Sequence, residues 1–381
     1  MTQVATRRVN GGRPPTTPRP SRRRQRRRLA RTVLVVVVVI TVALSLGRAL
    51  TAPGTDSVSA RLAEWARDHA LGGVVTAFER ETYRPPKVGG APPRTSPLGW
   101  GMASVVPAHR AGSTLPAPIP PIASPPLPGE GDWHVLDSVH GRPAMAAGYL
   151  RPDALHTSYV TGVVWFDPRL VRAELHPGTL DPGGRGWAEP KSLPANRRTG
   201  LLAAFNSGFR LNASRGGFYE AGRYGAPLRA GAASMVVRRD GTLTIGKWGR
   251  DAQLGPDVEA VRQNLALLVD GGRIAPGVDT NAGRAWGATL GNAKYVWRSG
   301  IGVRGDGGVV YVAGNRLTAR SLGELLHRAG SVRAMELDIN PEWTSFIRYT
   351  GKERNLLPDM QGSPRRYDTT SSRDFVALYA R

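Results

Sequence analysis

The sequence predicts an α+β fold, mostly antiparallel sheet with few helices, preceded by a single transmembrane helix. Short apolar or alternating runs recur between residues 144 and 337 with turn signals between them, a pattern typical of strands. Asp-Gly pairs at 240–241, 270–271 and 306–307 are typical of hairpin turns. An apolar run near the N-terminus is long enough to cross a bilayer.

Residues 1–28 are predicted to form a disordered, basic, cytoplasmic arm, because a segment rich in Arg, Pro and Thr buries too little apolar surface to fold. The formal net charge is +23, and residues 1–31 hold eleven arginines and no acid, which leaves about +12 (23 − 11) for the rest of the chain. Such an arm could bind nucleic acid, but its place before an apolar run favours a topological role. No nucleic-acid partner is expected.

Residues Leu29 to Leu50 are predicted to be a membrane-spanning signal-anchor helix. The arginine excess before it places the N-terminus in the cytoplasm and the C-terminal domain outside, in a single-pass protein of the cell membrane. A cleaved signal peptide is the alternative. Thr51-Ala52-Pro53 is a poor cleavage site and the segment before the apolar run is long, which favours a retained anchor.

Two further segments are expected before the folded body. Within the juxtamembrane segment 51–83, Asp56 or Ser57 can cap a helix through about Ala70, with Gly72-Gly73 ending it. Residues 84–130 carry thirteen prolines, which predicts a semi-rigid linker that holds the body away from the bilayer.

The body is predicted to span 131–381 and to consist mainly of strands. One helix is expected at 318–329, with Ser321 and Glu324 in a capping-box pattern and Gly330 as its stop. The strands are expected at 144–150, 159–166, 201–205, 233–237, 242–246, 265–269, 301–303, 309–312 and 335–337.

Several chemistries lack support in the sequence. There is no cysteine, which excludes disulfides, a thiolate nucleophile and Cys-ligated metal. Walker, G-x-S-x-G and H-E-x-x-H motifs are absent. Gly300 to Gly305 matches G-x-G-x-x-G, but a strand follows where a dinucleotide-binding loop needs a helix.

The best candidate site is the acidic stretch at 332–342. If 332–338 is a strand, Glu336 and Asp338 share one face, and Pro341 ends the strand where the acids stand. An exposed strand end with solvated acids is the alternative reading. Asp338, Asn340 and Glu342 are also oxygen ligands at alternating positions that could hold Ca²⁺, but no metal residue is assigned and no cofactor is required.

Two other stretches offer polar groups next to strands. Phe205 to Phe209 reads F-N-S-G-F, a turn in which Asn206 supplies both a donor and an acceptor. Arg298 precedes an apolar strand and could bind a phosphate with two hydrogen bonds. Read alone, the first is better explained as an ordinary turn and the second as a surface arginine.

The order of these motifs resembles the phosphodiester glycosidase family, which includes the enzyme that removes N-acetylglucosamine from a phosphodiester to uncover mannose 6-phosphate. The resemblance covers roughly 160–350 and rests on F-N-S-G-F, G-G-F-Y, A-S-M-V-V-R-R-D-G-T-L-T-I-G, W-G-R-D, V-R-Q-N-L-A-L-L-V-D-G-G, R-S-G-I-G-V and M-E-L-D. It implies that Asn206, Arg298 and Asp338 line an active site. The chain departs from the family in having Ile339-Asn340-Pro341-Glu342-Trp343 where a glycine-rich run is usual, and Ser207 in place of a glycine.

The resulting hypothesis is an extracytoplasmic hydrolase that cleaves a sugar from a phosphodiester, in cell-wall glycopolymers or glycolipids. Asp338 is expected to be nucleophile or base and Glu336 the acid or second carboxylate. Arg298 is expected to bind the phosphate, Asn206 and Asn340 the sugar hydroxyls, and Trp343 a sugar ring. The alternative is a non-catalytic module that binds an anionic wall polymer, the altered loop having removed turnover.

Overall fold

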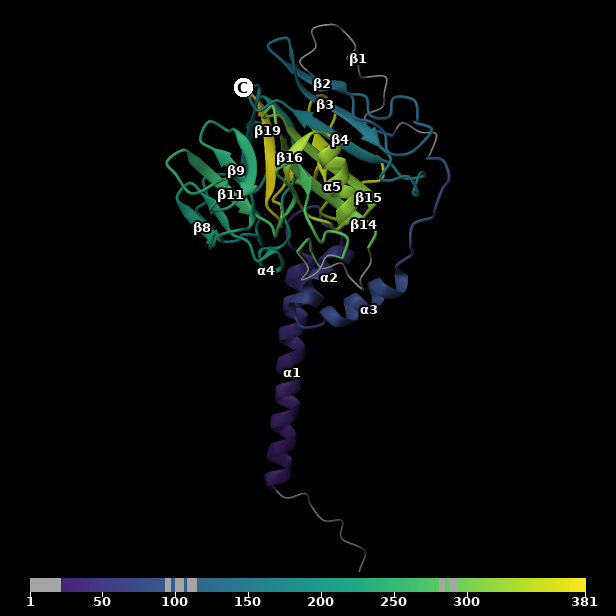
Figure 1. The fold of residues 1–381 in the computed structure, drawn as a ribbon. Coiled ribbons are helices and arrows are strands. Elements are labelled where there is room, and N and C mark those ends of the chain that lie inside the picture. The colour runs from purple at the N-terminus through teal and green to yellow at the C-terminus, as the bar shows by residue number, and fades with distance from the viewer. Residues whose placement is uncertain (1–21, 93–96, 100–105, 108–114, 281–284, 288–293) are drawn as a thin grey trace, which may run out of the picture. The chain divides into compact units, whose positions relative to one another are not determined.

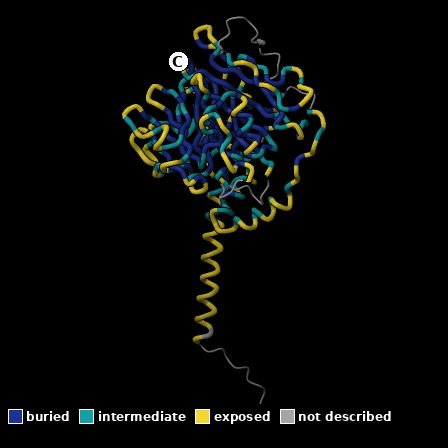
Figure 2. The backbone as a smooth tube through the Cα atoms, viewed as in Figure 1, coloured by how far each residue is buried: buried dark blue, intermediate teal, exposed yellow. Residues whose placement is uncertain are grey.

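The computed structural model describes residues 22–92, 97–99, 106–107, 115–280, 285–287 and 294–381. Residues Met1–Ala52 and Pro53–Arg381 form two separate compact units. The first contains α1 (Arg22–Leu50), most of whose described side chains are exposed (Figure 2). Its span Gln25–Leu50 is long and apolar enough for a single-pass membrane anchor or a signal sequence.

The predicted disordered arm needs a correction. Residues 1–21 lie outside the described residues, but 22–28 continue α1 instead of being disordered. Arginine has a good helix propensity, so the apolar helix can extend through the basic run.

The second unit, called the body here, contains three sheets whose paired strands are all antiparallel among the described residues (Figure 1). The nine-stranded sheet has the order β1 (Val106–Pro107), β2 (His134–Val139), β3 (Arg142–Leu150), β4 (Thr161–Phe166), β15 (Val309–Leu317), β14 (Val296–Arg304), β16 (Ser331–Glu336), β12 (Leu267–Asp270) and β13 (Arg273–Ile274). One five-stranded sheet has the order β10 (Leu243–Lys247), β9 (Ala233–Arg238), β11 (Val258–Gln263), β7 (Phe218–Glu220) and β8 (Arg223–Ala226). The other has the order β18 (Arg354–Asn355), β17 (Phe346–Arg348), β6 (Leu201–Asn206), β19 (Phe375–Ala380) and β5 (Val171–His176). The predicted fold class is confirmed.

The main core contains apolar side chains from all three sheets, including Met145, Phe205, Met235 and Met335. Helix α5 (Ala319–Arg328) packs on the nine-stranded sheet, where its leucines form a second apolar cluster with β3, β4 and β15. Because strands from distant parts of the chain pair within each sheet, the loops after β6 and β16 can meet.

The cap of α5 differs from the expected one. Thr318 is the N-cap, and its side chain and that of Ser321 bind each other's backbone N–H groups. Glu324, which was expected to complete the capping box, pairs with Arg320 instead. The capping residues differ because α5 begins one turn earlier than a capping box of Ser321 and Glu324 would require.

All three Asp-Gly turns are confirmed. They connect β9 to β10, β12 to β13 and β14 to β15. Gly241 and Gly307 have φ values of +78° and +87°, which glycine adopts without steric cost. The G-x-G-x-x-G match starts within β14 and runs into the turn before β15, as expected from the strand that follows it.

The segment between α1 and the first sheet is more folded than expected. The expected helix forms as α2 (Val58–Asp68), with Ser57 as its N-cap, but Gly72 then begins a second helix, α3 (Gly72–Thr82), which was not expected. Two short 3₁₀ helices (Ala195–Arg197 and Arg366–Asp368) and α4 (Leu211–Ser214) occur later in the body.

The proline-rich stretch 84–130 is not a free spacer where the structure describes it. Leu98, Ile119 and Ala123 are buried, and Leu98 and Ile119 belong to the two apolar clusters described above. Glu130 forms a buried ion pair with Arg151 at 2.8 Å. Apolar side chains between the prolines therefore hold these parts of the stretch on the rest of the body. Composition alone did not reveal this packing.

Candidate functional site

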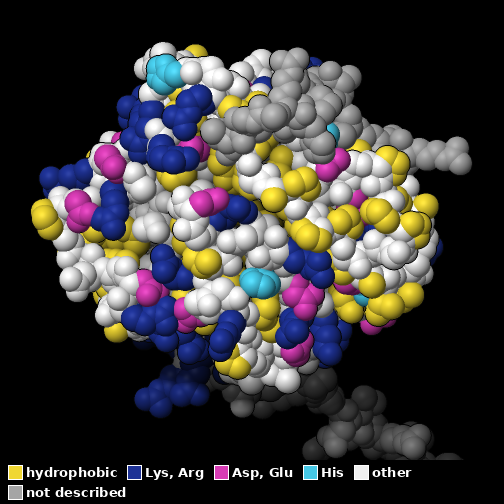
Figure 3. Space-filling model, turned by 45° about the horizontal axis from the view of Figure 1, so that its top comes forward, with side chains coloured by type: hydrophobic (Ala, Val, Ile, Leu, Met, Phe, Trp, Pro, Cys, Tyr) yellow, Lys and Arg dark blue, Asp and Glu magenta, His cyan; other side chains and the backbone are white. Residues whose placement is uncertain are grey.

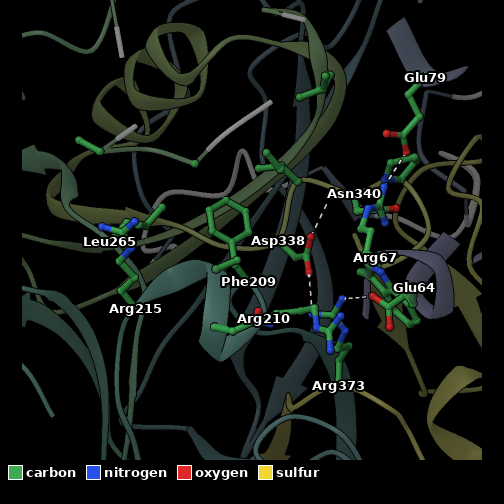
Figure 4. A pocket seen from close by; sticks show the side chains of 18 of the residues that line it. Glu64, Arg67, Glu79, Phe209, Arg210, Arg215, Leu265, Asp338, Asn340 and Arg373 are labelled. Carbon is green, nitrogen blue, oxygen red and sulfur yellow. Dashed lines mark hydrogen bonds and ion pairs between the residues drawn. The ribbon is translucent and has the colours of Figure 1, made fainter. Parts of the chain in front are cut away.

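A cavity of about 820 Å³ opens between the α2–α3 hairpin, the turn after β6 and the loop after β16 (Figure 4). Its wall combines four arginines with carboxylates and apolar or aromatic side chains. The arginines are Arg67, Arg210, Arg215 and Arg373; the carboxylates are Glu64, Glu79 and Asp338; the aromatic residues are Tyr83, Phe209 and Trp343.

Asp338 is held firmly in the cavity wall. Its backbone N–H donates to the Ser207 carbonyl at 3.0 Å, and its own carbonyl accepts from the Ser299 hydroxyl at 2.8 Å. Its side-chain Oδ1 accepts from the Asn340 N–H at 2.9 Å. Burial raises the pKa of Asp338 to about 6, although the nearby Arg373 opposes this shift. Asp338 is 5% exposed, and its carboxylate can take up a proton near pH 6.

Arg373 is the cation that pairs with Asp338 within the described residues, and the sequence did not single it out. Its Nη1 lies 3.9 Å from Asp338 Oδ2 and 3.4 Å from Asp181 Oδ2, and its Nη2 pairs with Glu64. Figure 4 shows Arg373 between Glu64 and Asp338. Burial lowers the pKa of this guanidinium, but the three carboxylates outweigh burial and raise it. Arg373 is therefore a buried cation whose Nη1 makes no hydrogen bond to either aspartate.

Glu336 and Arg298 form a second pair, away from the cavity wall. Arg298 Nη1 binds Glu336, and its Nε donates to the Leu317 carbonyl at 3.0 Å. Both side chains are almost fully buried, and neither lines the cavity. Burial raises the pKa of Glu336 to about 7, with Arg298 opposing it. The structure thus brings Glu336 and Arg298 together but separates them from the cavity that Asp338 faces.

Asn206 lies at the end of β6 with both of its side-chain atoms engaged. Its Oδ1 accepts from the Tyr311 hydroxyl at 2.9 Å and the Ser345 N–H at 3.0 Å, and its Nδ2 donates to the Ser299 hydroxyl at 2.9 Å. Ser299 in turn binds the Asp338 carbonyl. Asn206 therefore supports the loop that carries Asp338. The sequence predicted instead that Asn206 contacts the sugar hydroxyls.

Asn340 and Trp343 both line the cavity. Asn340 folds the loop, since its Oδ1 accepts from the Glu342 N–H at 2.9 Å. Trp343 is only 4% exposed, and the guanidinium carbons of Arg366 and Arg373 each lie 4.9 Å from the centre of its ring. The indole therefore positions arginines through cation–π contacts.

The remaining arginines of the cavity differ in how far they are neutralised. Arg210 binds Asp68 at 2.7 Å, and Arg67 binds Glu79 at 2.7 Å. Arg215 ends α4 in the left-handed conformation, with a φ of +51°, and is exposed. Its side chain has no ion pair within the described part of the chain, which leaves a positive charge available at the cavity wall.

Two groups of side chains bear on metal binding. Glu174, His176 and Glu189 offer ligand atoms that lie within 4.8 Å of one another. Arginines already bind both of these glutamates, Arg172 on Glu174 and Arg197 on Glu189.

The three side chains whose oxygens suggested Ca²⁺ all accept hydrogen bonds from backbone N–H groups. Asp338 and Asn340 each accept the N–H two residues further on, and Glu342 accepts the Ser57 N–H at 2.9 Å. Each of these three side chains thus binds backbone in the loop or in the chain before α2.

Comparisons with known proteins give a distant likeness. No protein-family model matches the chain, and no curated protein matches it significantly. A search of solved structures finds the catalytic domain of zebrafish N-acetylglucosamine-1-phosphodiester α-N-acetylglucosaminidase, auto-inhibited by its pro-peptide. It is 14% identical with a TM-score of 0.42, covering 66% of this chain and 88% of that one. A hypothetical protein from Synechocystis is 12% identical with a TM-score of 0.38, covering 64% of each chain. The likeness concerns the fold, and it is distant.

Sequence reasoning found Asp338 but missed Glu64, Asp181 and Arg373. These residues lie far apart along the chain, and each stands in a context that is ordinary for its residue type. The one available signal was Ser371-Ser372-Arg373-Asp374, a polar run directly before the apolar strand β19. Arg298 was singled out for the same reason, because it precedes an apolar strand.

Proposed function

We propose that this chain is a membrane-anchored, extracytoplasmic hydrolase that cleaves a sugar from a phosphodiester, in cell-wall glycopolymers or glycolipids. The observation that carries the proposal is the pairing of a buried carboxylate with arginines in one cavity. Asp338, Arg373 and Arg215 line the same cavity. The order of sequence motifs supports the same reaction.

The chemistry of this substrate fits a site with one accessible carboxylate and several cations. Hydrolysis breaks the bond between the anomeric carbon and the phosphate oxygen, and water supplies the hydroxyl that replaces the phosphate. A phosphate group leaves as an anion, so cations that balance its charge lower the barrier more than a proton donor would. The opposite face needs a carboxylate that attacks the anomeric carbon or activates water.

We assign Asp338 to the role of nucleophile or base. Arg373 and Arg215 are assigned to the phosphate, in place of Arg298, because both line the cavity. Arg298 keeps Glu336 paired behind the wall. Asn206 is assigned to supporting the Asp338 loop, while Asn340 and Trp343 remain candidates for contact with the sugar.

A non-catalytic module that binds an anionic polymer is the second candidate. The position of Glu336 favours this candidate. Glu336 does not line the cavity, so only one of the two predicted catalytic carboxylates faces the cavity. On the face of the protein in Figure 3, Lys and Arg side chains are interspersed with Asp and Glu. A polymer bound there would meet alternating charges, so the cavity arginines are the better contact.

The test uses the full chain in detergent micelles with a panel of methyl sugar-1-phosphodiesters, and it follows release of free sugar. Wild type is compared with Asp338→Asn and with Asp306→Asn, an acid on the exposed turn between β14 and β15. Hydrolysis that Asp338→Asn loses by a factor of about 100 or more, and Asp306→Asn retains, supports the proposal. No hydrolysis of any member, with salt-sensitive binding of a wall polymer that Asp338→Asn retains, supports the binding module instead.

A further inference from the structure

Helices α2 and α3 form a hairpin at one edge of the body (Figure 1). Each helix has two distinct sides. One side faces the cavity, through Glu64 and Arg67 of α2 and Glu79 of α3, with Tyr83 directly after α3. Their spacings of three and four residues place each pair on one side of its helix. The hairpin is thus part of the site, and its other side is available for a second contact.

That other side is apolar and exposed. Leu71, Val74 and Phe78 recur at intervals of three and four residues along α3, and Val58 and Leu62 do the same on α2. These five side chains are between 40% and 70% exposed. They are half of the ten large exposed hydrophobic residues in the described parts of 53–381, although the hairpin spans only residues 58–82. This concentration exceeds the scatter expected of a soluble surface.

The place of the hairpin in the chain indicates what covers this apolar side. Val58, the first residue of α2, comes eight residues after Leu50, the last residue of the apolar helix α1. Exposed cationic residues Arg80, Arg84 and Lys87 follow along α3 and just after it. A short amphipathic helix with an apolar side and nearby cations is the pattern of a segment that lies in a bilayer interface with anionic headgroups.

We propose that the apolar side of the α2–α3 hairpin lies in the outer leaflet of the membrane and that the adjoining cavity takes a lipid-linked sugar phosphate. The substrate class rests on the function proposed above. The sugar and its phosphodiester enter the cavity beside Asp338 and Arg373, while the lipid on the far side of the phosphate stays in the bilayer. Hydrolysis then releases free sugar and leaves the lipid phosphate monoester in the membrane.

The membrane contact is tested by fluorescence quenching in the full chain. Because the chain has no cysteine, Phe78→Cys gives a single labelling site for bimane. Leu254→Cys is the matched control, since Leu254 is an exposed apolar residue on the loop between β10 and β11. In nanodiscs that contain anionic lipids and doxyl-labelled phosphatidylcholine, the label at 78 should be quenched and the label at 254 should not. Equal quenching at both positions overturns the contact.

The substrate class is tested with phytanyl and methyl esters of α-glucose 1-phosphate and of α-N-acetylglucosamine 1-phosphate. Wild type in nanodiscs should cleave the phytanyl ester with a kcat/KM about ten-fold or more above that for the methyl ester. The double variant Val74→Ser, Phe78→Ser should lose this preference while cleaving the methyl ester as before, since neither residue lines the cavity. The control pair Tyr224→Ser, Leu254→Ser should keep it.

Three outcomes distinguish the two proposals. Equal cleavage of both esters by wild type overturns the lipid-linked substrate and leaves the hydrolase standing. A preference that survives in Val74→Ser, Phe78→Ser overturns the role of the hairpin. Cleavage of neither ester overturns the proposed function and the substrate class with it, whereas the quenching experiment decides the membrane contact by itself.

Discussion

Replacing Asp338 with Asn tests whether this carboxylate lies where its charge is disfavoured. Burial, opposed by Arg373, raises its pKa from 3.8 to about 6. The native protein then binds this proton more tightly than the unfolded chain does. The side chain therefore stabilises the fold below about pH 4, and this stabilisation is lost as the pH rises through about 6.

The size of the effect follows from the shift. A change of about 2 pKa units (6 − 3.8) corresponds to about 3 kcal/mol of unfolding free energy. Asn has a similar shape and carries no charge at any pH, so the variant escapes the loss. We expect the unfolding free energy of Asp338→Asn to rise relative to wild type by up to about 3 kcal/mol between about pH 4 and about pH 8.

Guanidinium unfolding of the full chain in detergent micelles, followed by tryptophan fluorescence, measures this difference. All nine tryptophans lie between Trp65 and Trp343, so the signal reports the body and not α1. Asp306→Asn is the control, because Asp306 is largely exposed and its substitution should give no such gain. A difference between Asp338→Asn and wild type that stays constant over this pH range, or a variant that is less stable at about pH 8, would refute the reasoning.

Three further predictions concern the same site. The kcat/KM for a sugar-1-phosphodiester should fall about ten-fold per pH unit below about pH 6, because Asp338 must be ionised to attack; a rate that is flat from pH 4 to 8 contradicts that role. Replacing Arg298 with Met leaves Glu336 buried without its cation, so the fold should lose about 3–5 kcal/mol of unfolding free energy at about pH 8 in denaturant titrations. A loss below about 1 kcal/mol would show that water reaches this pair. Replacing Glu64 with Gln should increase the affinity for inorganic phosphate several-fold in calorimetric titrations, because it removes the carboxylate that binds Arg373; unchanged affinity would remove Arg373 from the phosphate site.

The parts of the fold that sequence could predict are those with strong local signals. The Asp-Gly turns fixed three hairpins, and the apolar periodicity of 318–329 located α5. The strand β11 was missed because Arg262 interrupts its apolar alternation. That arginine is fully buried and forms an ion pair at 2.6 Å with Asp374, which lies 112 residues further along the chain. No local pattern carries such a contact.

The candidate site divides along the same line. The alternation around β16 predicted that Glu336 and Asp338 share one face, which leaves Met335 and Leu337 on the other, and these two belong to the main core. It could not predict that Glu336 is sealed inside while Asp338 meets the cavity, because β16 ends between them and the chain turns toward Ser207. Glu64 lies on α2, within residues 51–83, which the sequence predicted to be a juxtamembrane segment and not a part of the site.

The two arginine–carboxylate pairs differ in whether a ligand can exchange with them. Arg298 and Glu336 bind each other directly, and neither lines the cavity, so opening this pair would leave a buried charge without compensation. Arg373 and Asp338 lie 3.9 Å apart, beyond hydrogen-bond distance, and both line the cavity. A phosphate could replace the Glu64 carboxylate on Arg373 and keep this guanidinium paired, since one anion would take the place of another. The arginine that a ligand can reach is therefore the one whose present partners come from three distant segments, and this is the reason that it was invisible in the sequence.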